Sequence, residues 1–202
     1  MVKKAAFTLI ELIFAIVIIA ITVVSLPMMN QAVSKGISAN IVQEAIFAAA
    51  TELNSAVSAN WDANSSEPNI STYARVIETT PGYCDATTRL MDGHIKQPLH
   101  RRCLESNTTR ASNTKLNADA LEDMGHGSKN IFVDTTTEAA GYKDTYTSEV
   151  TITPNASFGV LNSDPNIKEI EIIVKNSSGK TIVKLKTYSC NIGEVDYYSR
   201  SY

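Results

Sequence analysis

The stretch KKAAFTLIELIFAIVIIAITVVSLP, residues 3–27, decides how this chain can fold. From residue 7 to residue 26 every side chain is apolar or a small hydroxyl, except Glu11. A helix of this length would be about 30 Å long, enough to cross the hydrocarbon core of a bilayer. Lys3 and Lys4 precede it, so the positive-inside rule leaves the N-terminus in the cytoplasm and exports the remainder. The sequence therefore predicts an N-terminal membrane-spanning helix.

A cleaved secretory signal peptide is the alternative reading of this segment, because it has the same basic start and apolar run. Three features argue against it. The run is longer than a typical signal-peptide apolar region, no clear A-x-A cleavage site follows it, and an acid lies near its start.

The acid, Glu11, needs a partner, because a carboxylate in a membrane helix costs about 2.5–3.5 kcal/mol at the helix centre and less near its end. If the chain were cut before Phe7, the new α-amino group would lie one helical turn before Glu11. The amine of an axially shifted neighbouring copy could then neutralise the carboxylate. Such a head-to-tail pairing repeats into an open helical filament.

The residues KKAAFTLIEL, 3–12, resemble the prepilin cleavage and methylation motif of type IV pilins and type II secretion pseudopilins. The resemblance implies that prepilin peptidase removes a leader, residues 1–6, by cutting between Ala6 and Phe7, and that it methylates the Phe7 amine. Glu11 would then serve filament assembly by pairing with that amine. Two positions depart from the family pattern, and the first is Ala6, which stands where glycine is usual.

The same resemblance implies that residues 7–29 form the transmembrane and assembly helix, with Pro27 as the helix-breaking proline of the family, one position earlier than usual. The implied partners are other pilin or pseudopilin subunits, prepilin peptidase, an inner-membrane assembly platform, and membrane lipid before assembly. The prepilin would cross the inner membrane once, with its C-terminal domain in the periplasm, and would then enter a periplasmic pseudopilus or a cell-surface pilus.

The resemblance also favours a minor pilin or pseudopilin over a major one. The chain, at 202 residues, is longer than typical major pseudopilins and lacks their C-terminal calcium-loop pattern. Glu11 separates it from the tip pseudopilin that lacks the acid. Type II secretion, type IV pilus biogenesis and competence all remain open.

Residues 30–61 carry apolar side chains at intervals of four, which predicts an amphipathic continuation of the same helix. The positions are Val33, Ile37, Ile41, Ala45, Ala49, Leu53, Val57 and Trp61. This half is expected to dock on a sheet while the apolar half protrudes.

Residues 146–202 are predicted to form an antiparallel sheet and a C-terminal tail. The segments 168–175 and 181–188 flank NSSGK, residues 176–180, a hairpin signal with glycine in the turn. A third segment, 145–153, has alternating apolar residues at Tyr146, Val150 and Ile152. The same alternation occurs at Ile170, Ile172 and Val174 in 168–175, and less regularly at Ile182 and Leu185 in 181–188. A long helix packed on such a meander is an α+β fold, which is also the pilin architecture.

The region between them, residues 62–145, is predicted to be loop-rich and variable, with a short helix or strand at 71–79 and a short helix at 115–124. Its Cys84 and Cys103 are expected to form a disulfide in an oxidising compartment, leaving Cys190 unassigned. A zinc set that adds His94 and His100 to the two cysteines fits no compact template.

The sequence predicts no catalytic, cofactor or metal site. It contains no G-x-S-x-G, P-loop, H-E-x-x-H or dinucleotide fingerprint, so we expect the protein not to be an enzyme. The basic cluster 96–102 could touch DNA phosphates, but in a chain of net charge −3 a solvated loop or a contact to an acidic subunit is favoured. The segments 62–66 and 105–109 resemble an acid-containing glycosylation sequon. The competing hypothesis is a membrane-tethered periplasmic module that binds a ligand or DNA and does not polymerise.

Overall fold

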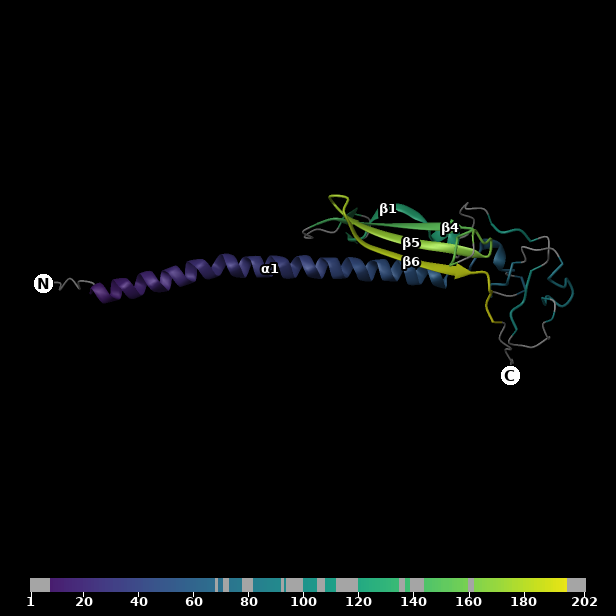
Figure 1. The fold of residues 1–202 in the computed structure, drawn as a ribbon, viewed down its shortest axis with the longest axis horizontal. Helices are drawn as coiled ribbons and strands as arrows, with labels where there is room; N and C mark the ends of the chain where they lie inside the picture. The colour runs from purple at the N-terminus through teal and green to yellow at the C-terminus, as the bar shows by residue number, and fades with distance from the viewer. Residues whose placement is uncertain are drawn as a thin grey trace. The chain divides into compact units, whose positions relative to one another are not determined.

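The computed structural model describes residues 8–67, 69–70, 73–77, 82–91, 93, 100–104, 108–111, 120–134, 137–138, 144–159 and 162–195. In chain order the elements are α1 (Leu9–Ser58), the 3-10 helices η1 (Ala63–Ser65) and η2 (Leu121–Met124), and the strands β1 (His126–Asn130), β2 (Val133–Asp134), β3 (Thr137–Glu138), β4 (Tyr146–Pro154), β5 (Ile167–Asn176) and β6 (Thr181–Cys190) (Figure 1). The chain separates into two compact units, Met1–Glu44 and Ala45–Tyr202. The predicted leader, residues 1–6, and Phe7 lie outside the described residues.

Four strands form one antiparallel sheet in the order β1-β4-β5-β6, and β2 pairs with β3 in a separate ladder. A long helix followed by this sheet confirms the predicted α+β class. The boundary of the sheet was predicted wrongly, because β1 lies inside the region expected to be loops. Its sequence, HGSKN, is exposed over four of five positions on a sheet edge and so carries no alternating apolar signal.

The β5–β6 hairpin forms where the sequence predicted it, with Gly179 in the turn at φ +79°, a left-handed conformation that glycine adopts freely. The alternating residues of β5 are fully buried: Ile170, Ile172 and Val174. On β6, Val183 and Leu185 lie opposite Val174 and Ile172. Ile182, predicted to continue the apolar side less regularly, lies at a register shift of the hairpin, because Val174 pairs with Val183 and Lys175 pairs with Thr181.

The other face of the sheet carries cross-strand ion pairs. Lys184 Nζ lies 2.7 Å from Glu171, Lys186 Nζ lies 2.8 Å from Glu169, and Lys175 Nζ lies 3.1 Å from Glu149. Hydrogen bonding to Glu169, and then to Tyr188, raises the pKa of Lys186. The lysine side chains are 39–54% exposed, so each pair contributes little to stability.

The last turns of α1 lie along the sheet (Figure 1), where Ser148 Oγ of β4 donates to Glu52 Oε1 of the helix. The helix residues buried there have small side chains. Ala45, Ala49 and Ala56 are buried, whereas Val57, on the predicted stripe, is 52% exposed. A strict interval of four exceeds the 3.6 residues of a helical turn, so a stripe spaced that way winds off the buried face. The buried positions instead step by four and by seven, which keeps them on one side of the helix.

The irregular region is held by isolated bridges between distant segments. Val76 N donates to Arg102 O at 2.9 Å and Leu104 N donates to Val76 O at 2.8 Å, which makes a parallel bridge between Val76 and Cys103. Among the described residues of the predicted element 71–79, this bridge replaces a helix or strand. The helix predicted at 115–124 is present as η2 over its last four residues, and 115–119 lie outside the described part.

The end of the described chain, residues 191–194, clamps the same region. Asn191 Oδ1 accepts from Ile77 N at 2.9 Å, and Asn191 Nδ2 donates to Ile77 O. Glu194 N donates to Ala74 O at 2.7 Å, and a Glu194 carboxylate oxygen accepts from Ala74 N at 3.0 Å. Between these contacts Gly193 has φ +61°, and a Cβ added there would lie 2.9 Å from the backbone nitrogen of Val76.

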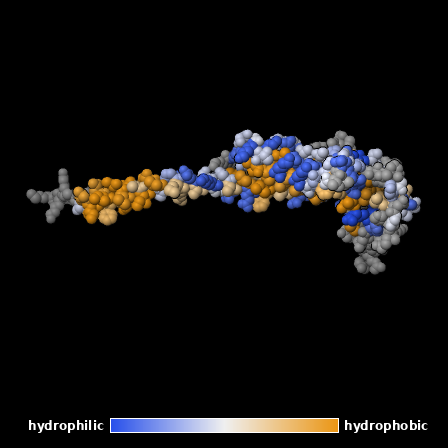
Figure 2. Space-filling view, in the orientation of Figure 1, coloured by the Kyte–Doolittle hydropathy of each residue, from blue (hydrophilic) through white to orange (hydrophobic). Residues whose placement is uncertain are grey.

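The first unit contains the N-terminal part of α1, whose large apolar side chains between Leu9 and Met29 are exposed (Figure 2). Their exposed fractions range from 48% at Val17 to 76% at Leu9. α1 is the one helix among the described residues that is long and apolar enough to cross a membrane. The predicted helix break at Pro27 is not seen, because α1 continues through it. Proline removes one N–H donor, and the hydrogen bonds of the neighbouring turns still close the helix on both sides.

Gly193→Ala should destabilise the protein more than Gly179→Ala. Both glycines have positive φ, so both variants lose about 1 kcal/mol to backbone strain. Only the Cβ at residue 193 meets backbone atoms, which should add at least about 1 kcal/mol. Urea unfolding of the full chain in detergent, followed by far-UV circular dichroism, measures the difference. Equal losses would contradict the close approach of Gly193 to Val76.

Candidate functional site

Glu11 lies at the start of α1, where it forms a capping box with Thr8. Thr8 N and Thr8 Oγ1 both donate to Glu11 Oε2 at 2.9 Å, and Glu11 N lies 3.4 Å from Thr8 Oγ1. These bonds satisfy N–H groups that have no partner within the first helical turn. The pattern T-x-x-E at residues 8–11 is the sequence signal of this capping box, and the predicted intermolecular role of Glu11 did not include it. The carboxylate thus has an intramolecular role, which also fixes its orientation.

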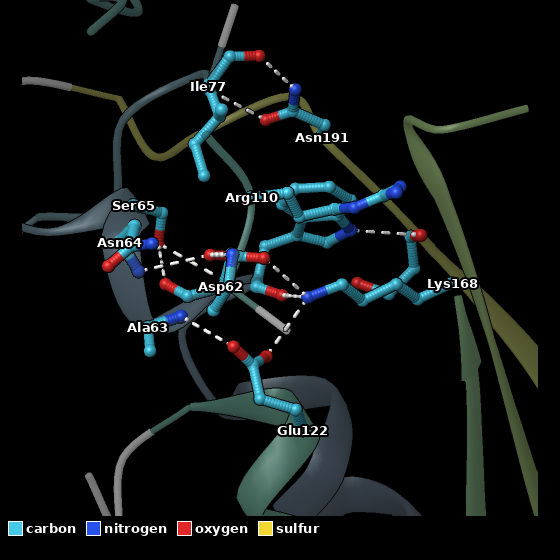
Figure 3. A network of polar contacts seen from close by, with 12 residues as sticks. Asp62, Ala63, Asn64, Ser65, Ile77, Arg110, Glu122, Lys168 and Asn191 are labelled. Carbon is cyan, nitrogen blue, oxygen red and sulfur yellow. Dashed lines mark hydrogen bonds and ion pairs between the residues drawn. The ribbon is translucent and has the colours of Figure 1, made fainter. Parts of the chain in front are cut away.

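A second polar cluster is buried where α1 ends and the chain enters η1 (Figure 3). Lys168 Nζ, from β5, lies 2.9 Å from Asp62 Oδ2, 3.0 Å from Glu122 Oε2 and 2.8 Å from Trp61 O. It also lies 4.4 Å from the centre of the Trp61 ring. The side chains of the lysine and both acids are at most 3% exposed. All three hydrogens of the ammonium group therefore have acceptors, as a buried charge requires.

The two carboxylates are fixed by backbone donors on their other oxygens. Asp62 Oδ1 accepts from Asn64 N at 3.0 Å and from Ala111 N at 2.8 Å, and Glu122 Oε1 accepts from Ala63 N at 2.8 Å. Asp62 is the N-cap of η1. One cluster thereby joins the end of α1, the loop at 108–111, η2 and the central strand β5.

This cluster was not predicted, although the sequence contains one signal for it. Lys168 has the same parity as Ile170, Ile172 and Val174, so an alternating strand places it on the buried side. A lysine there needs a buried partner. The acids that supply it, Asp62 and Glu122, are 106 and 46 residues away in the chain, so their identity could not be read from spacing.

The first glycosylation-like segment, 62–66, overlaps this cluster. Asp62 is fully buried, and Asn64 Nδ2 donates to Thr109 O at 2.9 Å. The acid–x–Asn–Ser order is therefore used here as a helix cap. The second such segment has its acid and its asparagine, Glu105 and Asn107, outside the described residues.

The N-terminal residues are the part of the chain that a comparison with known families identifies. Residues 1–26 match the family described as the prokaryotic N-terminal methylation motif. The match supports a type IV pilin-like precursor. Searches of curated proteins and of solved structures gave no significant match. The motif suggests assembly with pilin-type subunits and processing by a prepilin peptidase, and the long apolar helix α1 is consistent with a membrane anchor.

Cys84 and Cys103 form a disulfide, and Cys190 is an exposed thiol. The bond closes a loop whose ends are 19 residues apart. Inside it, Asp85 accepts from Thr88 N at 2.6 Å and from Thr87 N at 2.8 Å, which holds its pKa below the usual range. The two sulfurs of the weak zinc set are thus bonded to each other, and its His94 lies outside the described residues.

The basic cluster 96–102 is described only from His100 onward. Arg101 Nε donates to Gly193 O at 3.3 Å, and the Arg102 guanidinium donates to Thr88 O at 3.0 Å. Both arginines therefore brace the loops around the disulfide, which is a structural use of their charge.

Alkylation of the native, unreduced protein should label one cysteine, and alkylation after reduction should label three. Replacing both Cys84 and Cys103 by serine should lower the free energy of unfolding by about 3 kcal/mol, since the disulfide restricts a loop of this size in the unfolded chain. Intact mass spectrometry counts the alkylated thiols, and urea unfolding measures the loss. Three labelled thiols without reductant would exclude the bond.

Lys168→Met should lower the free energy of unfolding by about 3–5 kcal/mol, because it leaves two buried carboxylates without their cation. Lys175→Met is the matched control on the same strand. Its partner, Glu149, is 40% exposed, so the loss should stay within about 1 kcal/mol. Urea unfolding of both variants gives the comparison, and similar losses would show that the buried cluster is not special.

Proposed function

We propose that the protein is a minor pilin or pseudopilin, a structural subunit of a type IV pilus-like filament. The match of residues 1–26 to the methylation motif carries the proposal. The exposed apolar surface of α1 supports it, because such a surface requires either lipid or other helices around it. The subunit would be held in the inner membrane as a prepilin and would then polymerise through α1.

Glu11 is proposed to act during assembly as the partner of the methylated Phe7 amine of a neighbouring subunit. Processing after Ala6 would create that amine, so the ion pair could not exist before the leader is removed. The capping box supports this role, since it holds the carboxylate at the helix start in a fixed orientation. An oriented carboxylate loses less conformational freedom on pairing than a freely rotating one.

The globular part is proposed to have a structural and not a catalytic role. Residues 62–145, which by resemblance correspond to the variable region of pilin-like proteins, would form the surface that distinguishes this subunit from others. The filament would serve type II protein secretion or type IV pilus biogenesis, with its soluble part in the periplasm before assembly.

Glu11→Gln separates the two roles of this acid and is the sharpest test. Glutamine can retain the capping box but carries no charge for the Phe7 amine. Filament assembly should fail, as it should in Glu11→Ala, while membrane insertion persists. Thr8→Val is the control, because it removes the cap hydroxyl and keeps the acid, so it should still assemble.

Membrane fractionation, filament shearing and mass spectrometry of the mature N-terminus are the measurements. Mature protein should begin at methylated Phe7 in all four forms, wild type included. Normal assembly of Glu11→Gln would contradict the proposed ion pair. A chain that is inserted but never found in filaments, even as wild type beside its own assembly proteins, would favour the membrane-tethered binding module.

A further inference from the structure

The buried cluster around Lys168 has the arrangement of a condensation site. We infer that Lys168 Nζ and the side-chain carbon of Asp62, Cγ, join in an intramolecular isopeptide bond, with Glu122 as the proton carrier. The inference rests on the contacts of this cluster alone and is independent of the proposed filament role.

The nucleophile is already in place. Lys168 Nζ lies 2.9 Å from Asp62 Oδ2, along a hydrogen bond that can carry a proton from the ammonium group to the carboxylate. The result is a neutral amine beside a neutral carboxylic acid, which are the reactive forms of the two groups. Because the fold holds the two groups 2.9 Å apart, the reaction is intramolecular and does not pay the entropy cost of bringing two separate molecules together.

The electrophile is polarised from the opposite side. Asp62 Oδ1 accepts from Asn64 N at 3.0 Å and from Ala111 N at 2.8 Å. Two fixed backbone donors at these distances are the arrangement that stabilises negative charge on a tetrahedral intermediate. Asp62 Oδ2, the oxygen that faces the lysine, is left as the leaving group.

The third member, Glu122, can move the protons. Its Oε2 lies 3.0 Å from Lys168 Nζ, and its Oε1 is fixed by Ala63 N at 2.8 Å. The surface Lys–Glu pairs of β4, β5 and β6 differ from this cluster, because each joins one lysine to one glutamate and is partly exposed. A lysine close to one carboxylate is therefore common in this sheet. The cluster around Lys168 differs because it is buried and has a second carboxylate in contact with the same amine.

The reaction balances without an oxidant or other reagent. After the first proton transfer, the Nζ lone pair attacks Asp62 Cγ, and the electrons of the C=O bond move onto Oδ1, held by Asn64 N and Ala111 N. Glu122 takes one proton from the nitrogen. The intermediate collapses, the Cγ–Oδ2 bond breaks, and Glu122 returns the proton to the departing hydroxide. The products are an amide between Lys168 and Asp62, one water molecule and an unchanged Glu122.

The bond would link positions 106 residues apart and fasten the chain just after α1 to the central strand of the sheet. Together with the disulfide between Cys84 and Cys103, it would make two covalent ties in the globular part. The disulfide can be removed by reductant, whereas the amide cannot.

The test is peptide mapping of the full-length protein, purified in detergent, reduced, alkylated and digested with trypsin. Trypsin does not cut after a lysine whose side chain is acylated. In the wild type, peptide 36–75 should therefore be joined to an uncut peptide 144–175, with a mass one water below their sum. Fragmentation should place the link between Asp62 and Lys168.

Three variants assign the roles. Lys168→Arg should give no link. Glu122→Gln should slow link formation by roughly 10²-fold or more, as loss of a general acid–base group does. Glu171→Gln, which alters a surface pair on the same strand, should leave the link intact. Separate, unlinked peptides 36–75, 144–168 and 169–175 in the wild type would overturn the inference, whatever the variants do. A link that forms equally fast in Glu122→Gln would overturn the role of Glu122.

Discussion

The pairing of Lys168 with two buried acids is the constraint on which the globular part depends. A lysine on the apolar side of a central strand can remain there only if other segments bring carboxylates to it. Asp62 comes from the end of α1 and Glu122 from η2. Leaving the ammonium group without partners would cost free energy. The cluster therefore holds two segments against β5: the chain that follows α1, through Asp62, and η2, through Glu122.

The sequence predicted those parts of the fold whose signals are local. The alternation of Ile170, Ile172 and Val174 and the turn around Gly179 were sufficient for the hairpin, since each signal lies within one or two elements. The stripe at intervals of four was right about the helix and wrong about part of its buried face, because the interval does not match the helical turn. Edge strand β1 and the isolated bridges lack any periodic signal, so they become visible only in three dimensions.

In the candidate sites, too, local signals could be read from the sequence and contacts between distant segments could not. Glu11 was identified from its chemical improbability, and its bonds to Thr8 show a local requirement that the same residue satisfies. Asp62 was noticed as part of a modification-like segment, yet its burial and cap geometry decide its use. Short polar motifs specify which hydrogen bonds are available. The surrounding fold determines which of them are made.

The irregular region is large for a compact domain, and its organisation follows from long-range polar ties. Asn191 fastens Ile77, the disulfide fastens Cys103, and Asp62 fastens the backbone at Ala111. Each tie joins segments that are not neighbours in the chain, and so holds described stretches that lie outside the short helices and strands of this region. Asp62 is four residues beyond the end of α1, and its partner Lys168 is on β5, so the buried cluster fastens the chain that leaves the helix to the sheet.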